Sequence, residues 1–160
     1  MKKLEIYLDT FVLGGCFEPE FSVWSTGLVA DFRVGNFTPV LSELLEAELL
    51  RAPEQVRKVY FELVPFAEKR PVVGDEALNL LAAYEAHGVL GSKFRADMLH
   101  IALATIAGVD LLVSWNFKHI VRFDKIRLFN AVNLEQGYKP LTIHSPREVA
   151  TYGTETDPSR

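Results

Sequence analysis

A short apolar segment near the N-terminus ends on a carboxylate. Within residues 3–10, Leu4, Ile6 and Leu8 recur at every second position, which is the spacing of a short buried β-strand. Asp9 follows this strand directly. In an open parallel α/β sheet, ligands bind in the crevice outside the carboxyl ends of the strands, so Asp9 is a candidate site residue. The alternative for Asp9 alone is a helix cap or an Asx-turn.

The composition is typical of one globular domain. The chain has 160 residues, of which 49% are hydrophobic, enough for a sizeable core. Its net charge of −4 gives no overall basic field, although acids gathered around a metal would lower this charge without excluding nucleic acid. Cys16 is the single cysteine, which excludes an internal disulfide and fits a reducing compartment. We expect a domain over residues 1–150 and a polar tail over 151–160.

Two features argue against export and membrane insertion. Glu5 and Asp9 interrupt any apolar stretch that would resemble a signal peptide. The sequence has no run of about 18 apolar residues, the length needed to span a membrane. We therefore expect a cytoplasmic protein.

The order of apolar patterns predicts alternating strands and helices. Further strands are expected at residues 37–41, 110–114 and 141–143. Helices are expected at 20–34, 43–50, 54–63, 75–87 and 92–107, with another beginning at the capping-box sequence 145–148. Residues 64–73 contain two prolines and fit a loop or a weak edge strand. Strands that alternate with helices predict a three-layer α/β/α sandwich around a central parallel sheet.

Helical geometry separates the three glutamates of the helix expected at 43–50. At about 100° per residue, Glu48 falls on the apolar stripe that contains Leu45 and Leu49, whereas Glu43 and Glu46 fall on the opposite side and are expected to be solvated. A carboxylate on a buried stripe is costly unless it is paired, protonated or bound to a metal. Glu48 is therefore a candidate site residue, with a salt bridge at the edge of the stripe as the alternative.

Two further polar residues are candidates by their position. Asp97 lies in the first turns of the helix expected at 92–107, which has little polar surface; stabilisation of the helix N-terminus is the alternative role. His100 follows one turn later, as a support for the site or as a hydrogen-bonded core histidine. Asn116 comes just after the apolar strand 111–113, where a turn residue is the alternative.

These candidates supply three carboxylates and one amide oxygen to one end of the predicted sheet. They are Asp9, Glu48, Asp97 and Asn116. Hard oxygen ligands suit Mg²⁺ or Mn²⁺ better than zinc. A metal of this kind lowers the pKa of a bound water and neutralises a scissile phosphate. The set therefore predicts a metal-dependent hydrolytic site.

Four short segments carry a resemblance to a known family. They are residues 6–10 (IYLDT), 41–49 (LSELLEAEL), 95–102 (RADMLHIA) and 112–117 (LVSWNF). In their order and spacing the chain resembles the PIN-domain family, especially the VapC-type toxin ribonucleases. The resemblance extends over residues 3–150 and implies a PIN fold, in which a parallel sheet has helices on both faces.

The resemblance also implies an Mg²⁺- or Mn²⁺-dependent endoribonuclease, which hydrolyses RNA phosphodiester bonds with a metal-activated water. Asp9, Glu48 and Asp97 match the acidic metal-site positions of the family, and Asn116 matches a position that is usually Asp or Asn. His119 stands where many relatives have another Asp, which argues against a second metal ion and allows weak activity. The resemblance further implies a homodimer and a cognate antitoxin.

Basic residues near these motifs are candidate RNA contacts. A segment directly after Asn116 has the basic residues Lys118, His119, Arg122, Lys125 and Arg127, interleaved with Trp115, Phe117 and Phe123. Basic and aromatic side chains together hold phosphates and stack on bases, whereas a solvated basic loop with core aromatics is the alternative. The candidate RNA contacts are Lys93, Arg95, Ser114, Lys118, His119 and Arg122.

Two other functions fit parts of the pattern. A PIN scaffold that binds RNA or a protein without cleavage is favoured by His119 and by the acidic net charge. A phosphatase of the haloacid-dehalogenase type uses an aspartate at the end of the first strand, but it needs a second aspartate two residues later. Phe11 occupies that position. Retention of a divalent-metal site with RNA cleavage separates the nuclease from both alternatives.

Overall fold

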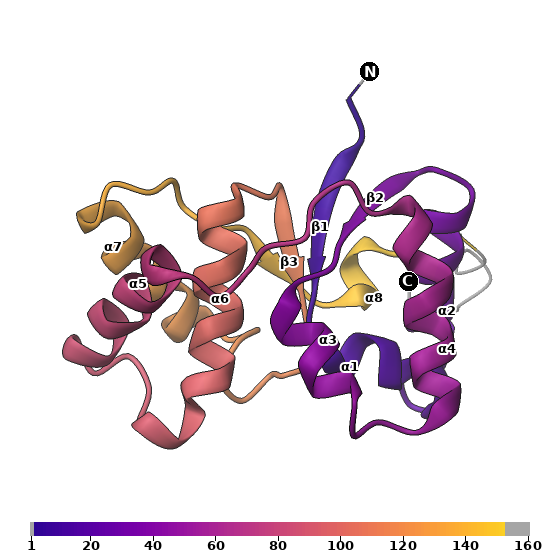
Figure 1. Cartoon of the computed structure of the whole chain (residues 1–160), viewed down its shortest axis with the longest axis horizontal. Coiled ribbons are helices and arrows are strands. Elements are labelled where there is room, and N and C mark those ends of the chain that lie inside the picture. The colour runs from indigo at the N-terminus through magenta and orange to yellow at the C-terminus, as the bar shows by residue number, and fades with distance from the viewer. Residues whose placement is uncertain (1, 153–160) are drawn as a thin grey trace.

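Four parallel strands form the central sheet, in the order β2-β1-β3-β4. The structure is a computed structural model that describes residues 2–152, so most of the expected tail (153–160) lies outside the described residues. The strands are β1 (Leu4–Leu8), β2 (Phe37–Val40), β3 (Leu111–Val113) and β4 (Ile143–His144). Because all four strands are parallel, their carboxyl ends lie at the same edge of the sheet (Figure 1).

Helices cover both faces of this sheet (Figure 1). They are α1 (Thr10–Gly14), α2 (Ser22–Arg33), α3 (Glu43–Leu49), α4 (Glu54–Leu63), α5 (Asp75–Ala86), α6 (Arg95–Ala107), α7 (Phe123–Glu135) and α8 (Pro146–Val149). Short 3-10 turns occur at η1 (Gly15–Phe17), η2 (Val64–Phe66) and η3 (Ser92–Phe94). One apolar core contains residues of α5, α6 and α7, and a second core contains residues of α1, α2, α3 and α4.

Alternation along β1 divides its side chains between these two cores. Ile6 and Leu8 pack with α1, α2 and α4, whereas Tyr7 packs with α5, α6 and α7. Successive side chains of a strand point to opposite faces of the sheet, and here both faces are covered. The predicted three-layer α/β/α sandwich with a central parallel sheet is confirmed.

The structure corrects several predicted elements. Of the two alternatives for residues 64–73, the loop is correct and the edge strand is not: the segment contains η2 and no strand, since two prolines interrupt it. The helix predicted at 92–107 begins as η3 and becomes α-helical at Arg95. The segment containing Lys125 and Arg127, treated above as a basic stretch of undefined structure, is part of α7. The short helix α1 was also not predicted, and β4 begins two residues later and ends one residue later than expected.

Other boundaries agree closely with the predictions. The helix α4 is Glu54–Leu63 as expected, and Ser145 and Glu148 form the predicted capping box of α8. Gly108 ends α6 with a left-handed φ of 66°, a conformation that glycine adopts without steric cost. Within residues 2–152, no helix has both the length and the apolar character required to cross a membrane.

Candidate functional site

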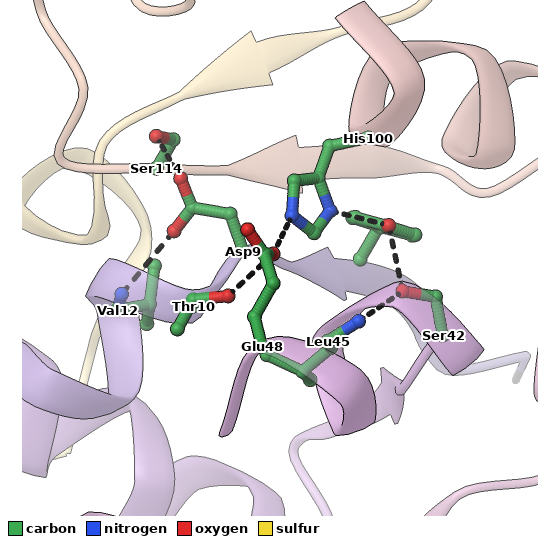
Figure 2. Close-up of polar contacts among 9 residues, drawn as sticks. Asp9, Thr10, Val12, Ser42, Leu45, Glu48, His100 and Ser114 are labelled. Carbon is green, nitrogen blue, oxygen red and sulfur yellow. Dashed lines mark hydrogen bonds and ion pairs between the residues drawn. The ribbon is translucent and has the colours of Figure 1, made fainter. Parts of the chain in front are cut away.

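Pairing of β1 with β3 brings two polar residues together at the carboxyl edge of the sheet. Leu8 lies opposite Val113, so the next residues, Asp9 and Ser114, emerge side by side. The Ser114 hydroxyl donates a hydrogen bond to Oδ2 of Asp9 (Figure 2). Oδ1 of Asp9 accepts a hydrogen bond of 3.2 Å from the backbone N–H of Val12, which makes Asp9 the N-cap of α1. Two contacts therefore orient this carboxylate.

The Asp9 carboxylate is 2% exposed and has an unusual affinity for a proton. Burial raises the pKa of Asp9 from 3.8 to about 6, against the opposing effects of the His100 charge and of hydrogen bonds from Ser114 and the Val12 amide. The negative charge of Asp97 raises this pKa further. Desolvation penalises the charged form of a carboxylate, and a bound cation would remove that penalty.

Glu48 lies on helix α3, at the same carboxyl edge of the sheet. Oε1 of Glu48 accepts a hydrogen bond of 2.8 Å from the Thr10 hydroxyl and lies 2.5 Å from Nε2 of His100 (Figure 2). Burial alone would raise the pKa of Glu48, but the hydrogen bond and charge of His100, together with the Thr10 hydrogen bond, lower it below its usual value. Glu48 is therefore held in the ionised form.

A chain of hydroxyl groups holds His100 from its other side. Nδ1 of His100 lies 2.7 Å from the Tyr7 hydroxyl, which donates a hydrogen bond of 2.8 Å to Oγ of Ser42. Oγ of Ser42 also accepts the N–H of Leu45 and so caps α3, the helix that bears Glu48 (Figure 2). Burial raises the pKa of Tyr7 far above its usual value, so this hydroxyl stays neutral.

The helix α6 contributes Asp97 from its first turn. Burial raises the pKa of the half-buried Asp97, whereas the charge of His119, a hydrogen bond from the Asn116 side chain and the charge of His100 lower it. The negative charge of Glu48 also raises the Asp97 pKa. These influences place Asp97 within electrostatic reach of Glu48, His100 and His119.

Asn116 connects the end of β3 to this site. Its backbone N–H donates a hydrogen bond of 2.9 Å to Oγ of Ser114, and its Oδ1 accepts one of 2.9 Å from the N–H of His119. Its side-chain amide reaches Asp97. Asn116 thus stabilises a turn and lies in the candidate site.

The structure brings together all four residues that were selected from the sequence. Each of them also has the structural role that was considered as its alternative. Asp9 caps a helix, Glu48 pairs with His100, Asp97 lies in a helical first turn and Asn116 bonds within a turn. The other two glutamates of α3 do not join the group: Glu43 accepts the N–H of Val73, and Glu46 pairs with Arg70.

The donor set has the chemistry of a hard divalent-cation site. It consists of three carboxylates and an amide oxygen, and the two carboxylates with raised pKa values, Asp9 and Asp97, would both be stabilised in ionised form by a cation. In the arrangement described for residues 2–152, however, no group of three or more His, Cys, Asp and Glu side chains is close enough to hold a metal ion. Oε1 of Glu48 is turned toward Thr10 and His100.

The basic candidates for RNA contact differ in their surroundings. Arg95 pairs with Glu85 at 2.8 Å, and Arg122 pairs with Asp124 at 2.8 Å. Lys93 lies over the Phe94 ring, 5.1 Å from its centroid, and the His119 ring packs on Phe94 with a centroid distance of 3.9 Å. Lys118 is exposed beside Asn116.

The role expected for Ser114 is corrected. Its side chain is fully buried, and its hydroxyl hydrogen is directed to Asp9, so Ser114 orients that carboxylate and does not reach RNA. The aromatic residues of the basic segment also divide: Trp115 is buried, whereas Phe117 and Phe123 are exposed.

Three supporting residues of the site were missed in the sequence. They are Thr10, Tyr7 and Ser42, which hold Glu48 directly or through His100. One signal was available for Tyr7, since its hydroxyl lies in the middle of a buried strand and buried hydroxyl groups need a hydrogen-bond partner. The sequence contains no comparable signal for the partner itself.

The fold is similar to that of a solved protein. A chain in the crystal structure of VapBC2 from Rickettsia felis, bound to a DNA fragment from their promoter, superposes with a TM-score of 0.55 at 14% sequence identity. The match covers 89% of this chain and 98% of that chain. The fold is PIN-like. At this identity the similarity extends to the fold alone, and neither a protein-family model nor a curated protein matches the sequence.

Proposed function

We propose that this protein is a divalent-metal-dependent endoribonuclease of the PIN/VapC type, which hydrolyses RNA phosphodiester bonds. One observation carries the proposal: three carboxylates and an amide lie within electrostatic reach of one another near the ends of β1 and β3, in a PIN-like sheet. The residues are Asp9, Glu48, Asp97 and Asn116. Acidic groups gathered at the carboxyl edge of a parallel sheet suit a site for a cation and a phosphate.

Asp9 and Asp97 would hold the cation, and Glu48 and Asn116 would add oxygen atoms directly or through water. When bound, Mg²⁺ or Mn²⁺ supplies a water of lowered pKa and offsets the charge of the scissile phosphate. The site matches this cation chemistry because its ligands are oxygen atoms and none is a thiolate.

The protein groups around the carboxylates have orienting roles in this reaction. Ser114 and the Val12 amide fix the direction of Asp9, and Thr10 fixes that of Glu48. His100 keeps Glu48 ionised, so this carboxylate can accept a hydrogen bond from the attacking water and orient it toward the phosphorus. The side-chain amide of Asn116 donates a hydrogen bond to Asp97.

The proposal extends to the partners of the protein. One similar solved structure is a VapBC2 complex bound to DNA, which supports a cognate antitoxin for this chain as well. The homodimer is proposed from the resemblance to the VapC-type toxins. The single cysteine fits a reducing compartment, in keeping with action on cytoplasmic RNA.

A PIN scaffold that binds RNA or a protein without cleavage is the second candidate. It is favoured by His119, which adds a basic group beside Asp97 where an additional acid was expected from the resemblance. The orientation of Glu48 also favours this second candidate. Its carboxylate contacts His100, and within residues 2–152 no group of three such side chains is close enough to hold a metal.

Cleavage of a mixed RNA pool by the purified protein distinguishes these candidates. The nuclease requires cleavage in Mn²⁺ or Mg²⁺, no cleavage in EDTA, and loss of cleavage in Asp97→Asn. Asp75→Asn is the matched control, because Asp75 is also an acid in the first turn of a helix, α5, and lies outside the site. A folded wild-type protein that cuts no RNA with either metal, or an Asp97→Asn variant that cuts normally, contradicts the nuclease.

A further inference from the structure

A cavity of about 330 Å³ opens directly beside the candidate site. Its lining includes Phe11, Glu18, Phe21, Trp115, Asn116 and Lys118. Asn116 belongs to both the cavity and the site, and Phe11 is only two residues from Asp9. A ligand that places a phosphate at the site therefore has this cavity next to it.

The cavity has one rigid aromatic wall. Trp115 is 7% exposed and stacks on Phe21, with ring centroids 4.3 Å apart and an angle of 23° between the ring planes. Nε1 of Trp115 donates a hydrogen bond of 2.8 Å to Oγ of Ser25, which in turn donates to the carbonyl of Val12. The indole is therefore fixed in orientation before any ligand binds.

The cavity is also lined by an exposed aromatic ring. The Phe11 side chain is 60% exposed, although it belongs to α1, whose neighbouring residues Val12 and Leu13 are fully buried. A phenylalanine ring in this position leaves apolar surface in water, and a flat aromatic ligand would cover it.

The charged groups of the cavity indicate the class of ligand. Lys118 lines it beside Asn116, and a cation at this position attracts a phosphate backbone. Glu18 also lines the cavity, and a carboxylate accepts hydrogen bonds from an exocyclic amino group of a nucleobase. An aromatic side chain of a protein partner would pack against the aromatic wall but would not pair with both the lysine and the carboxylate.

We propose that this cavity binds one unpaired nucleobase of the RNA, adjacent to the phosphate at the candidate site. The base stacks on the exposed Phe11 ring and packs against the wall formed by Phe21 and Trp115, Lys118 contacts the neighbouring phosphate, and Glu18 accepts from the amino group of adenine, cytosine or guanine. Uracil has no exocyclic amino group and binds more weakly. This inference rests on the proposed function for the identity of the ligand, but it concerns base recognition and not the chemical step.

Metal-free binding tests the cavity separately from cleavage. In a Trp24→Phe background, where Trp115 is the remaining tryptophan, the protein in EDTA is titrated with 2′-O-methyl tetranucleotides of adenine, cytosine or uracil. The expected result is a change in Trp115 fluorescence on binding and a higher affinity for adenine and cytosine than for uracil. Phe11→Ala should weaken binding roughly 5- to 150-fold, the range for loss of one base–aromatic stack.

Two variants serve as comparisons. Glu18→Ala should abolish the preference over uracil, since the acceptor for the amino group is gone. Phe61→Ala should bind as the parent does, because Phe61 is a similarly exposed phenylalanine (66%) on α4 and lies outside the cavity.

Equal binding by Phe11→Ala and its parent, or equal affinity for all three oligonucleotides, overturns the inference. Displacement of the oligonucleotides by N-acetylphenylalaninamide at the same concentration also overturns it, and assigns the cavity to a protein side chain. If the protein cleaves RNA and Phe11→Ala has unchanged binding and kcat/KM, the base-binding role of the cavity is rejected and the proposed nuclease activity is retained. If the oligonucleotides bind as expected and no metal supports cleavage, the proposed nuclease activity is rejected and the base-binding role of the cavity is retained.

Discussion

Nε2 of His100 lies 2.5 Å from Oε1 of Glu48, and this contact joins the two helical layers at the carboxyl edge of the sheet. His100 belongs to α6 and Glu48 to α3, whose buried leucines pack in the opposite core. The imidazole is buried and also contacts Tyr7. It is thus both a hydrogen-bonded core histidine and a direct support of the candidate site.

His100→Ala should lower the free energy of unfolding by about 1–3 kcal/mol, because it leaves the buried Tyr7 hydroxyl without this partner. Urea denaturation measures the effect. His87→Ala is the control: His87 pairs with Glu135 at the surface, 3.1 Å away, and exposed pairs of this kind contribute little. Equal midpoints for His100→Ala and the wild type would show that the contact does not stabilise the fold.

Asp9→Asn should stabilise the metal-free protein at pH 7–8 by up to about 3 kcal/mol. Burial raises the pKa of Asp9 from 3.8 to about 6. The folded protein therefore holds this proton more tightly than the unfolded chain, and stability is lost as the pH rises from about 4 to about 6. The gain in Asp9→Asn should disappear toward pH 4. Urea unfolding in EDTA across this range measures it, and a gain that does not vary with pH contradicts the burial argument.

Gly15 and Gly14 make a matched pair for a test of packing around Trp115. A Cβ on Gly15 would lie 2.6 Å from Oγ of Ser25 and 2.7 Å from Nε1 of Trp115, whereas one on Gly14 would meet nothing within 4 Å. Gly15→Ala should cost about 1–3 kcal/mol and change the tryptophan fluorescence. Gly14→Ala should be neutral or stabilise by about 0.4–1 kcal/mol, since its backbone is helical. The same effect for both variants would contradict the close approach of the Gly15 backbone to Trp115.

Lys118→Ala should weaken binding of single-stranded RNA and reduce the slope of log affinity against log salt by about 0.7, the value for one lost phosphate contact. Lys118 is exposed next to Asn116. Arg122→Ala should have a smaller effect because Arg122 already pairs with Asp124 at 2.8 Å. Fluorescence anisotropy at several salt concentrations in EDTA measures both slopes. An unchanged slope for Lys118→Ala places the RNA backbone elsewhere.

The parts of the fold that have a regular apolar period were predictable from the sequence. The periodicity of residues 54–63 marks α4, and the continuous apolar run 111–113 marks β3. The helix α7 was missed because its buried stripe is narrow, consisting of Phe129, Val132 and Asn133, while Phe123 and other large apolar residues of the helix are exposed. The helix α1 has only five residues, too few for a period to be recognised.

The candidate site was partly predictable for a different reason. Asp9 and Asn116 are identified by their position after apolar strands, and Glu48 by its place on an apolar stripe. The network that supports them joins residues far apart in the chain, such as Tyr7 with Ser42 and with His100. These pairings depend on the packing of α3 and α6 around β1, which local sequence patterns do not determine.

Titration of the protein with Mn²⁺ by isothermal calorimetry tests the central claim, that these oxygen ligands form one cation site. Wild type, Asp97→Asn and the control Asp75→Asn are compared in the absence of RNA. We expect saturable Mn²⁺ binding in wild type and Asp75→Asn, and an affinity lower by roughly tenfold or more in Asp97→Asn. No Mn²⁺ binding by the folded wild type, or equal binding by wild type and Asp97→Asn, would contradict it.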